Sequence, residues 1–119
     1  MSRHDREWLA DSSDARSGIS DHLQRGTLDD GPVFDAVRLR LIEIGEAVRR
    51  VSPELLANEP DIPWVDTAGM RDQIAHRSVD TSREIVPATI DSDLPPPSVA
   101  VQGLLRADPL VDGCVGATP

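Results

Sequence analysis

Tyrosine and lysine are absent from the sequence, and its 119 residues include one phenylalanine, two tryptophans and one cysteine. With so few aromatic side chains, a hydrophobic core has to be built from leucine, isoleucine, valine and alanine, whose spacing here lacks the alternation of strands. The single cysteine, Cys114, excludes an intrachain disulfide and fits a reducing compartment. The sequence therefore predicts an all-α domain without covalent cross-links.

Long apolar runs are missing as well. Residues 1–10 carry charged side chains and lack the apolar segment of a signal peptide. No run approaches the roughly 20 apolar residues that a membrane-spanning helix needs. We therefore expect a cytoplasmic protein that does not contact a membrane.

Positive charge is scarce, because twelve arginines face 21 acidic residues and the formal net charge is −9. Such a chain lacks the continuous basic surface that captures nucleic acid over a wide area. A small arginine-lined site remains compatible with this balance, since the guanidinium group makes planar, bidentate contacts with phosphate. Any contact with nucleic acid is therefore predicted to be narrow and sensitive to salt.

The common spacings of metal and catalytic sites are also absent. There are no paired cysteines and no His-x3-His for a metal ion, no Gly-x4-Gly-Lys phosphate loop and no Gly-x-Ser-x-Gly turn. The sequence thus predicts neither a metal ion nor a cofactor. Of the three histidines, His4 lies near a terminus expected to fray and His22 on a solvated helix face, which leaves His76 as the candidate.

The clearest element is a helix predicted over residues 33–51. Its apolar positions recur at steps of three and four residues, as in a helix that packs along the seam of a bundle: Phe34, Val37, Leu41, Ile44, Val48 and Val51. Its arginines are expected to pair within the helix and to leave a solvated face: Arg38 with Asp35, Arg40 with Glu43, and Arg50 with Glu46.

Shorter helices are predicted on both sides of this element. The first covers residues 5–24, with its inner side formed by Trp8, Leu9, Ala15, Ile19 and Leu23. Others begin after Ser52, run from Pro63 to about His76, and start at Thr81, which forms a capping box with Glu84. Pro87 should kink or shorten this last helix, and prolines 95–97 should separate it from a final one through Leu104. Residues 1–106 are thus expected to form the helical domain, and 107–119 a disordered tail.

An arginine, an acid and a histidine share the segment from Met70 to His76. Asp72 and His76 are four residues apart, so they lie on one helix face and can hydrogen-bond. Arg71 and His76 are five apart, roughly 140° around an ideal helix. They converge on one phosphate only if the helix loosens at His76 or if two subunits share a cleft. Spacing alone therefore favours a solvated arginine and a histidine in the last turn over a catalytic pair.

The order of several short stretches is more specific than any of them alone. They are Phe-Asp-Ala-Val at 34–37, Leu-Ile-Glu-Ile-Gly-Glu-Ala at 41–47, Ile-Pro-Trp at 62–64, Gly-Met-Arg-Asp through His at 69–76, and Asp-Leu-Pro at 93–95. With this order and spacing the chain resembles the HepT group of HEPN proteins, the partners of minimal nucleotidyltransferases in bacterial toxin–antitoxin pairs. The resemblance implies a HEPN-type bundle of four to five helices, a homodimer with the motif at its interface, and metal-independent RNA cleavage.

Carried over to this chain, the catalytic arginine and histidine of the family's R-x4-6-H motif correspond to Arg71 and His76, with Asp72 in the supporting polar position. The imidazole would transfer a proton and the guanidinium would stabilise the charged transition state. The tyrosine to which the family's antitoxin attaches AMP corresponds to Ser78. Three alternatives therefore stay open: the antitoxin controls this protein by binding alone, it attaches AMP to Ser78, or the control is lost. Ser78 can also be a solvated loop residue without a role in regulation.

Two functions follow from these observations. In the first, the protein is the toxin of a toxin–antitoxin pair and an endoribonuclease, held in check by a nucleotidyltransferase antitoxin. In the second, it is a non-catalytic helical protein that binds such a transferase or a nucleotide without cleaving RNA. The Arg71/His76 pair favours the first function, whereas the acidic charge and the missing tyrosine favour the second.

Overall fold

A computed structural model describes residues 1–107, with the side chain of Val79 excepted, and in this part every regular element is a helix. The chain order is α1 (Arg3–Arg25), α2 (Gly31–Arg49), α3 (Pro53–Leu56), α4 (Trp64–Ala75), α5 (Val79–Ala88), the π-helical turn η1 (Thr89–Asp93) and α6 (Pro95–Ala107). The predicted all-α bundle is confirmed. Residues 1–107 form six α-helices and the turn η1, where the resemblance implied four to five helices.

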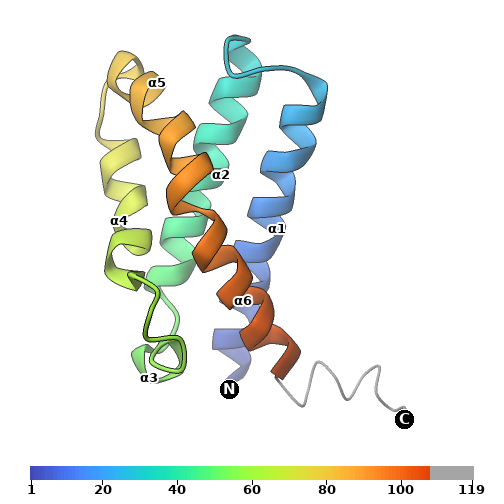
Figure 1. The fold of residues 1–119 in the computed structure, drawn as a ribbon, viewed down its shortest axis with the longest axis vertical. Helices are drawn as coiled ribbons and strands as arrows, with labels where there is room; N and C mark the ends of the chain where they lie inside the picture. Colours follow the sequence, from blue (N-terminus) through green and yellow to red (C-terminus); the bar gives the residue numbers. More distant parts are fainter. Residues whose placement is uncertain (108–119) are drawn as a thin grey trace.

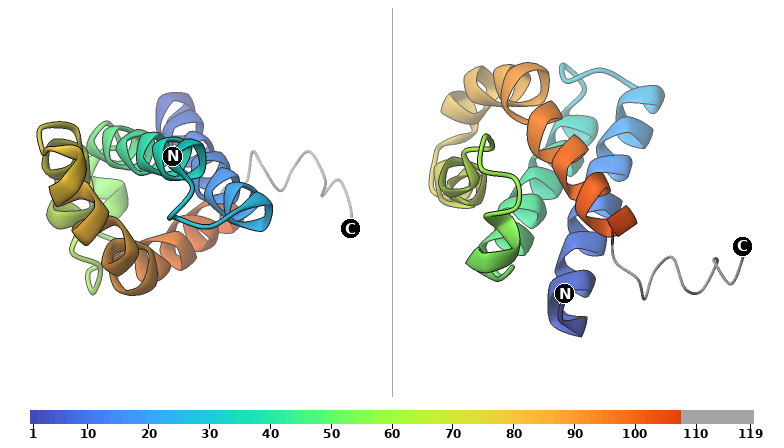
Figure 2. Two further views of the ribbon diagram at one scale, coloured as in Figure 1. Left: turned by 90° about the horizontal axis from the view of Figure 1, so that it is seen from above. Right: turned by 60° about the horizontal axis from the view of Figure 1, so that its bottom comes forward.

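The two long helices run antiparallel, and α4 packs beside α2 on the side away from α1 (Figure 1). From α5 the chain crosses back over the bundle through η1, so that α6 packs against α1. Seen from above, these elements surround a common core (Figure 2). The arrangement leaves the outer surfaces of α2 and α4 uncovered by the rest of the described chain.

The core confirms the predicted apolar seam of residues 33–51, since all of its positions are buried: Phe34, Val37, Leu41, Ile44, Val48 and Val51. Helix α2 itself ends at Arg49, so Val51 lies just beyond it. On α1, Leu9, Ala15 and Ile19 are buried as predicted and Trp8 is partly buried. The prediction for Leu23 was wrong. Its side chain stays 36% exposed, because it lies at the rim of a small hollow beside η1.

Serine and aspartate side chains set the starts of the long helices. Ser2 accepts a hydrogen bond from the N–H of Asp5 at 3.0 Å, and Asp30 accepts one from the N–H of Val33 at 3.5 Å. The helix predicted to begin at Val33 therefore begins two residues earlier. Ser52 does precede the short α3, but its side chain does not cap it. Its N–H and hydroxyl donate instead to Oδ1 of Asp5, at 2.9 and 3.0 Å.

The C-terminal third departs from prediction in two places. Helix α5 begins before Thr81, because Ser78 is the capping residue and accepts the N–H of Thr81 at 3.2 Å. Prolines 95–97 do not separate two helices but form the first turn of α6, where a missing N–H costs nothing. The effect of Pro87 is confirmed, since α5 ends one residue later and continues as the π-helical turn η1.

Two further expectations concern the chain as a whole. Within residues 1–107, no helix combines the length and the apolar character needed to cross a lipid bilayer. The predicted tail of residues 107–119 lies outside the described residues except for Ala107, which ends α6.

Candidate active site

Helix α4 carries the candidate residues, and its two ends are fixed by specific contacts. At the start, the indole N–H of Trp64 donates to the carbonyls of Leu56 and Glu59, at 3.0 and 3.1 Å, which ties the preceding loop to the helix. At the other end, His76 is the C-cap residue, with its N–H bonded to the carbonyl of Asp72 at 3.2 Å. The predicted end of this helix at His76 is confirmed.

The backbones of α2 and α4 touch at Gly45. A Cβ atom at this position would lie 2.7 Å from the backbone nitrogen of Arg71 and 3.1 Å from the carbonyl oxygen of Ala68. No residue larger than glycine fits unless the helices separate. The glycine of the Ile-Gly-Glu-Ala stretch therefore sets how closely α2 approaches the residue proposed as the catalytic arginine.

Arg71 is surrounded by carboxylates. Its Nη1 donates to Oδ1 of Asp72 at 2.9 Å, and its Nε lies 3.7 Å from Oε2 of Glu46 on α2. About a third of the side chain is exposed, 35%. The guanidinium thus lies on the outer surface with one edge toward α2 and with its terminal nitrogens near Asp72.

The same oxygen of Asp72 also faces the candidate histidine. Nε2 of His76 lies 3.9 Å from Oδ1 of Asp72, so the two residues do share one helix face. The predicted hydrogen bond between them is not formed, because this distance is too long. Since Arg71 and His76 both approach Oδ1 of Asp72, the angular separation expected for an ideal helix does not keep their functional groups apart within one chain.

Arg38 differs from its prediction. Instead of pairing with Asp35, its Nη2 donates to the carbonyl of Ile74 at 3.0 Å. The last carbonyls of a helix lack partners within the helix, so a cation there is favoured by both the hydrogen bond and the helix dipole. The predicted pairs of Arg40 with Glu43 and of Arg50 with Glu46 are confirmed, at 3.3 and 3.6 Å.

Ser78 is neither a free hydroxyl nor a plain loop residue. Besides accepting the N–H of Thr81, its hydroxyl donates to Oγ1 of Thr81 at 3.0 Å. The side chain therefore stabilises the start of α5. The expectation of a solvated loop residue is corrected to that of a helix cap, although the residue itself is exposed.

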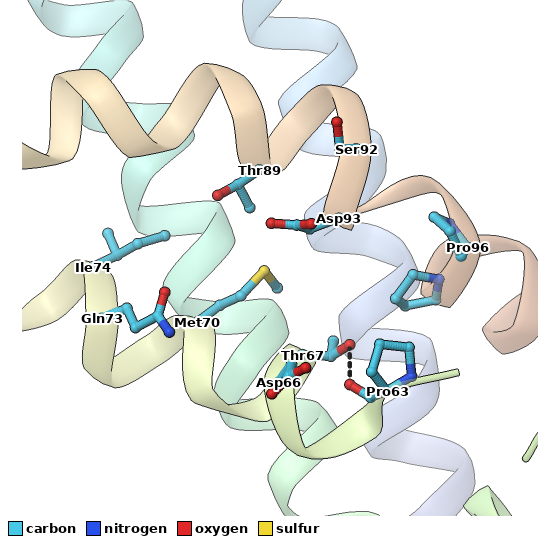
Figure 3. A pocket seen from close by; sticks show the side chains of 11 residues that line it. Pro63, Asp66, Thr67, Met70, Gln73, Ile74, Thr89, Ser92, Asp93 and Pro96 are labelled. Carbon is cyan, nitrogen blue, oxygen red and sulfur yellow. Dashed lines mark hydrogen bonds between the residues drawn. The ribbon is translucent and has the colours of Figure 1, made fainter. Parts of the chain in front are cut away.

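Three hollows surround α4 in the described part of the chain. The cavity in Figure 3, about 430 Å³, lies between α4 and η1, with Asp66 and Asp93 contributed by opposite elements. Its lining does not include Arg71 or His76. An apolar groove of about 610 Å³ lies between the end of α2, α3 and α4, and Asp72 is at its edge. A third hollow, about 420 Å³, reaches from Trp8 to Arg71 past Glu43 and Glu46.

Sequence reasoning missed the contact of Glu46 with Arg71 and assigned Glu46 only to Arg50. The signal was present in the Ile-Gly-Glu-Ala stretch, because a glycine on the buried side of a helix often marks a close helix crossing. Among the described residues, no group of three or more His, Cys, Asp or Glu side chains is arranged to hold a metal ion.

Comparison with known proteins places this site in context. The family description "Ribonuclease HepT-like" matches residues 13–102. A protein of Caldanaerobacter subterraneus subsp. tengcongensis that bears the name "Putative RNase" is 31% identical over 78 residues, which is 65% of this chain and 70% of that protein. No solved structure matches the chain.

Proposed function

Since this chain belongs to the HepT-like ribonuclease family, we propose that it is an endoribonuclease and that Arg71 and His76 are its catalytic pair. The observation that carries the proposal is their shared approach to Oδ1 of Asp72, at 2.9 Å from Arg71 and 3.9 Å from His76. A carboxylate oxygen resembles a phosphate oxygen in charge and size. A phosphate oxygen of RNA that displaces it would therefore lie within reach of both side chains.

The chemistry follows from the two functional groups. The imidazole of His76 takes the proton of an RNA 2′-hydroxyl, and the 2′-oxygen attacks the adjacent phosphorus. The bond from phosphorus to the 5′-oxygen of the next nucleotide breaks, and that oxygen receives a proton from water or from a second, protonated imidazole. The products are a 2′,3′-cyclic phosphate and a 5′-hydroxyl. Arg71 stabilises the added negative charge on the phosphorus-bound oxygens by charge-assisted hydrogen bonds.

A homodimer would supply a second copy of the pair, and one imidazole could then accept a proton while the other donates one. The apolar groove beside α4 supports such an assembly, because Val65 at its edge is 86% exposed. On this proposal, two α4 helices face each other and the composite site lies between them.

We also propose that the protein is the toxin of a toxin–antitoxin pair whose antitoxin is a nucleotidyltransferase. Transfer of AMP to Ser78 would replace the hydrogen that its hydroxyl donates to Oγ1 of Thr81, so this hydroxyl is not a free acceptor of the group. Control by binding of the transferase is therefore the mechanism favoured here. After incubation with that transferase and ATP, mass spectrometry should find Ser78 unmodified, and an AMP adduct on Ser78 would contradict this part of the proposal.

The second candidate function, a helical interaction protein without catalytic activity, is supported by one observation. Arg71 is already in contact with two carboxylates, Glu46 and Asp72, which compete with any phosphate. In that case the protein binds its partner and cleaves nothing.

An RNA cleavage assay in EDTA separates the two functions. We expect wild type to cleave and His76→Ala to lose at least about 100-fold in rate, the usual contribution of a general acid–base. Arg71→Ala should lose a similar factor. His22→Ala and Arg25→Ala make the same chemical changes on α1, which carries neither candidate residue, and should keep the wild-type rate. Equal cleavage by wild type and His76→Ala would refute the assignment, and no cleavage by wild type would favour the second function.

A further inference from the structure

Glu46 is the carboxylate at which α2 and α4 meet. Its oxygens lie 3.0 Å from Nη2 of Arg49, 3.6 Å from Nη2 of Arg50 and 3.7 Å from Nε of Arg71. The first two partners belong to its own helix, one turn further on. Only Arg71 comes from α4, so a contact with Arg71 is not needed to neutralise the charge of Glu46.

The contact with Arg71 involves the Nε edge of the guanidinium. A carboxylate on this edge restricts rotation of the planar group through Nε, whereas of the two terminal nitrogens Nη1 donates to Oδ1 of Asp72 at 2.9 Å. Those nitrogens form the edge that grips a phosphate with two parallel hydrogen bonds. Glu46 therefore orients the arginine through Nε, and a phosphate has to displace Asp72 to bind both terminal nitrogens.

The surroundings of Glu46 make this contact effective. Its side chain is 26% exposed, so the interaction is screened less than one between fully solvated side chains. The neighbouring Gly45 holds the two helix backbones in contact at the same level. The close crossing fixes the distance between α2 and the backbone of Arg71.

We propose that Glu46 is a positioning residue, which holds the guanidinium of Arg71 in the orientation required to bind the scissile phosphate. This inference rests on the proposed RNA cleavage. It assigns to the Ile-Gly-Glu-Ala stretch a role in the site and not only in the helix seam.

Glu43 offers a matched control. It lies one turn earlier on the same helix, pairs with Arg40 at 3.3 Å and lines the same hollow as Glu46. The variants Glu46→Gln and Glu43→Gln remove the same charge from the same surface. Removing a negative charge near the site should by itself favour RNA binding. A loss of activity in Glu46→Gln alone is therefore opposite to the general electrostatic effect.

The test measures kcat and KM for RNA cleavage. We expect Glu46→Gln to lower kcat by about 10- to 100-fold, the size typical of a small misplacement in an active site, with KM unchanged or lower. Glu43→Gln should keep kcat within about twofold. In an Arg71→Ala background, Glu46→Gln should cause no further loss, because its effect acts through Arg71. Wild-type kcat in Glu46→Gln, or a full additional loss in the Arg71→Ala background, would overturn the inference.

A second measurement does not depend on cleavage and so separates failure of the inference from failure of the proposed function. The Nε–H resonance of Arg71 can be identified by NMR as the signal lost in Arg71→Lys. Its exchange with solvent should be faster in Glu46→Gln than in wild type and unchanged in Glu43→Gln. If wild type cleaves no RNA, the proposed function fails and this signal still tests the contact. An Nε–H signal unaffected by Glu46→Gln would contradict the positioning role.

Discussion

Replacing Gly45 with alanine tests the helix crossing on which the candidate site depends. The added Cβ would lie 2.7 Å from the backbone nitrogen of Arg71, whereas ordinary van der Waals contact begins at 3.4 Å. The obstructing atom belongs to the backbone, so no side-chain rotation relieves the clash. Helix α4 has to move away from α2 by about 0.7 Å at this point, the difference between those two distances.

The cost of this movement can be estimated by comparison with a second glycine. Overpacking of this kind costs about 1–3 kcal/mol, while alanine in place of glycine inside a helix gains about 0.5–1 kcal/mol. At Gly69, inside α4, an added Cβ would meet no neighbouring atom within 4 Å. Gly69→Ala should therefore keep the whole helical gain, and Gly45→Ala should be less stable than Gly69→Ala by about 1–3 kcal/mol.

Urea unfolding followed by far-UV circular dichroism measures this difference. With a slope of about 1–3 kcal/mol per molar urea, the midpoints of the two variants should differ by about 1 M. RNA cleavage by folded Gly45→Ala should fall as well, since the backbone of Arg71 moves relative to Glu46. If Gly45→Ala is as stable as Gly69→Ala, the close crossing is not what the distances indicate and the reasoning fails.

Three other substitutions test the scaffold. Burial raises the pKa of Asp5, but the hydrogen bonds from the backbone and side chain of Ser52 outweigh it, so the net pKa lies below its ordinary value. A depressed pKa gives stability that is present above the unfolded-state pKa of about 4 and is lost as the pH falls through the folded-state value. The urea midpoint of wild type should therefore fall once the pH is lowered below about 4, whereas the midpoint of Asp5→Asn should depend less on pH. The same pH dependence of the midpoint in both proteins would contradict this. Trp64→Phe removes an indole N–H bonded to two carbonyls and should cost about 1–2 kcal/mol in the free energy of urea unfolding; an unchanged value would refute the role of these bonds. Pro87→Ala supplies an N–H for the carbonyl of Arg83 and should stabilise the protein by about 1 kcal/mol or more, which raises the melting temperature by several degrees. A lower melting temperature in Pro87→Ala would contradict this prediction.

Local sequence patterns were sufficient to predict features that depend on one helix alone. The apolar seam of α2 repeats with the period of a helix, so its buried face could be predicted without knowledge of its neighbours. The end of α4 at His76 was predictable for a similar reason. Helix starts were harder. Ser78 and Thr81 are both good capping residues, and only the hydrogen bond from the N–H of Thr81 to Ser78 decides between them.

The side-chain partners that belong to a different helix could not be identified from these patterns. Arg38 was assigned to a carboxylate on its own helix, but the carbonyl of Ile74, 36 residues away, is its partner. Glu46 and Arg71 meet for the same reason, because two helices cross at one glycine. Intrahelical rules count residues along one axis, whereas these contacts depend on the distance and angle between two axes.

The balance of charge at this crossing explains how an acidic chain could bind RNA. Over the whole sequence the acidic residues dominate, with a net charge of −9. Around Glu46, however, Arg49, Arg50 and Arg71 gather on one carboxylate, and Asp72 is the other acid in contact with Arg71. Phosphate that displaces Asp72 would meet Arg71 beside this group of arginines. On the proposed function, binding would therefore involve few phosphates. Its affinity should fall as salt is raised, as the sequence predicts, but less steeply than that of a broad basic surface. Selectivity would then depend on the fit of one scissile phosphate between Arg71 and His76 and not on capture of long RNA.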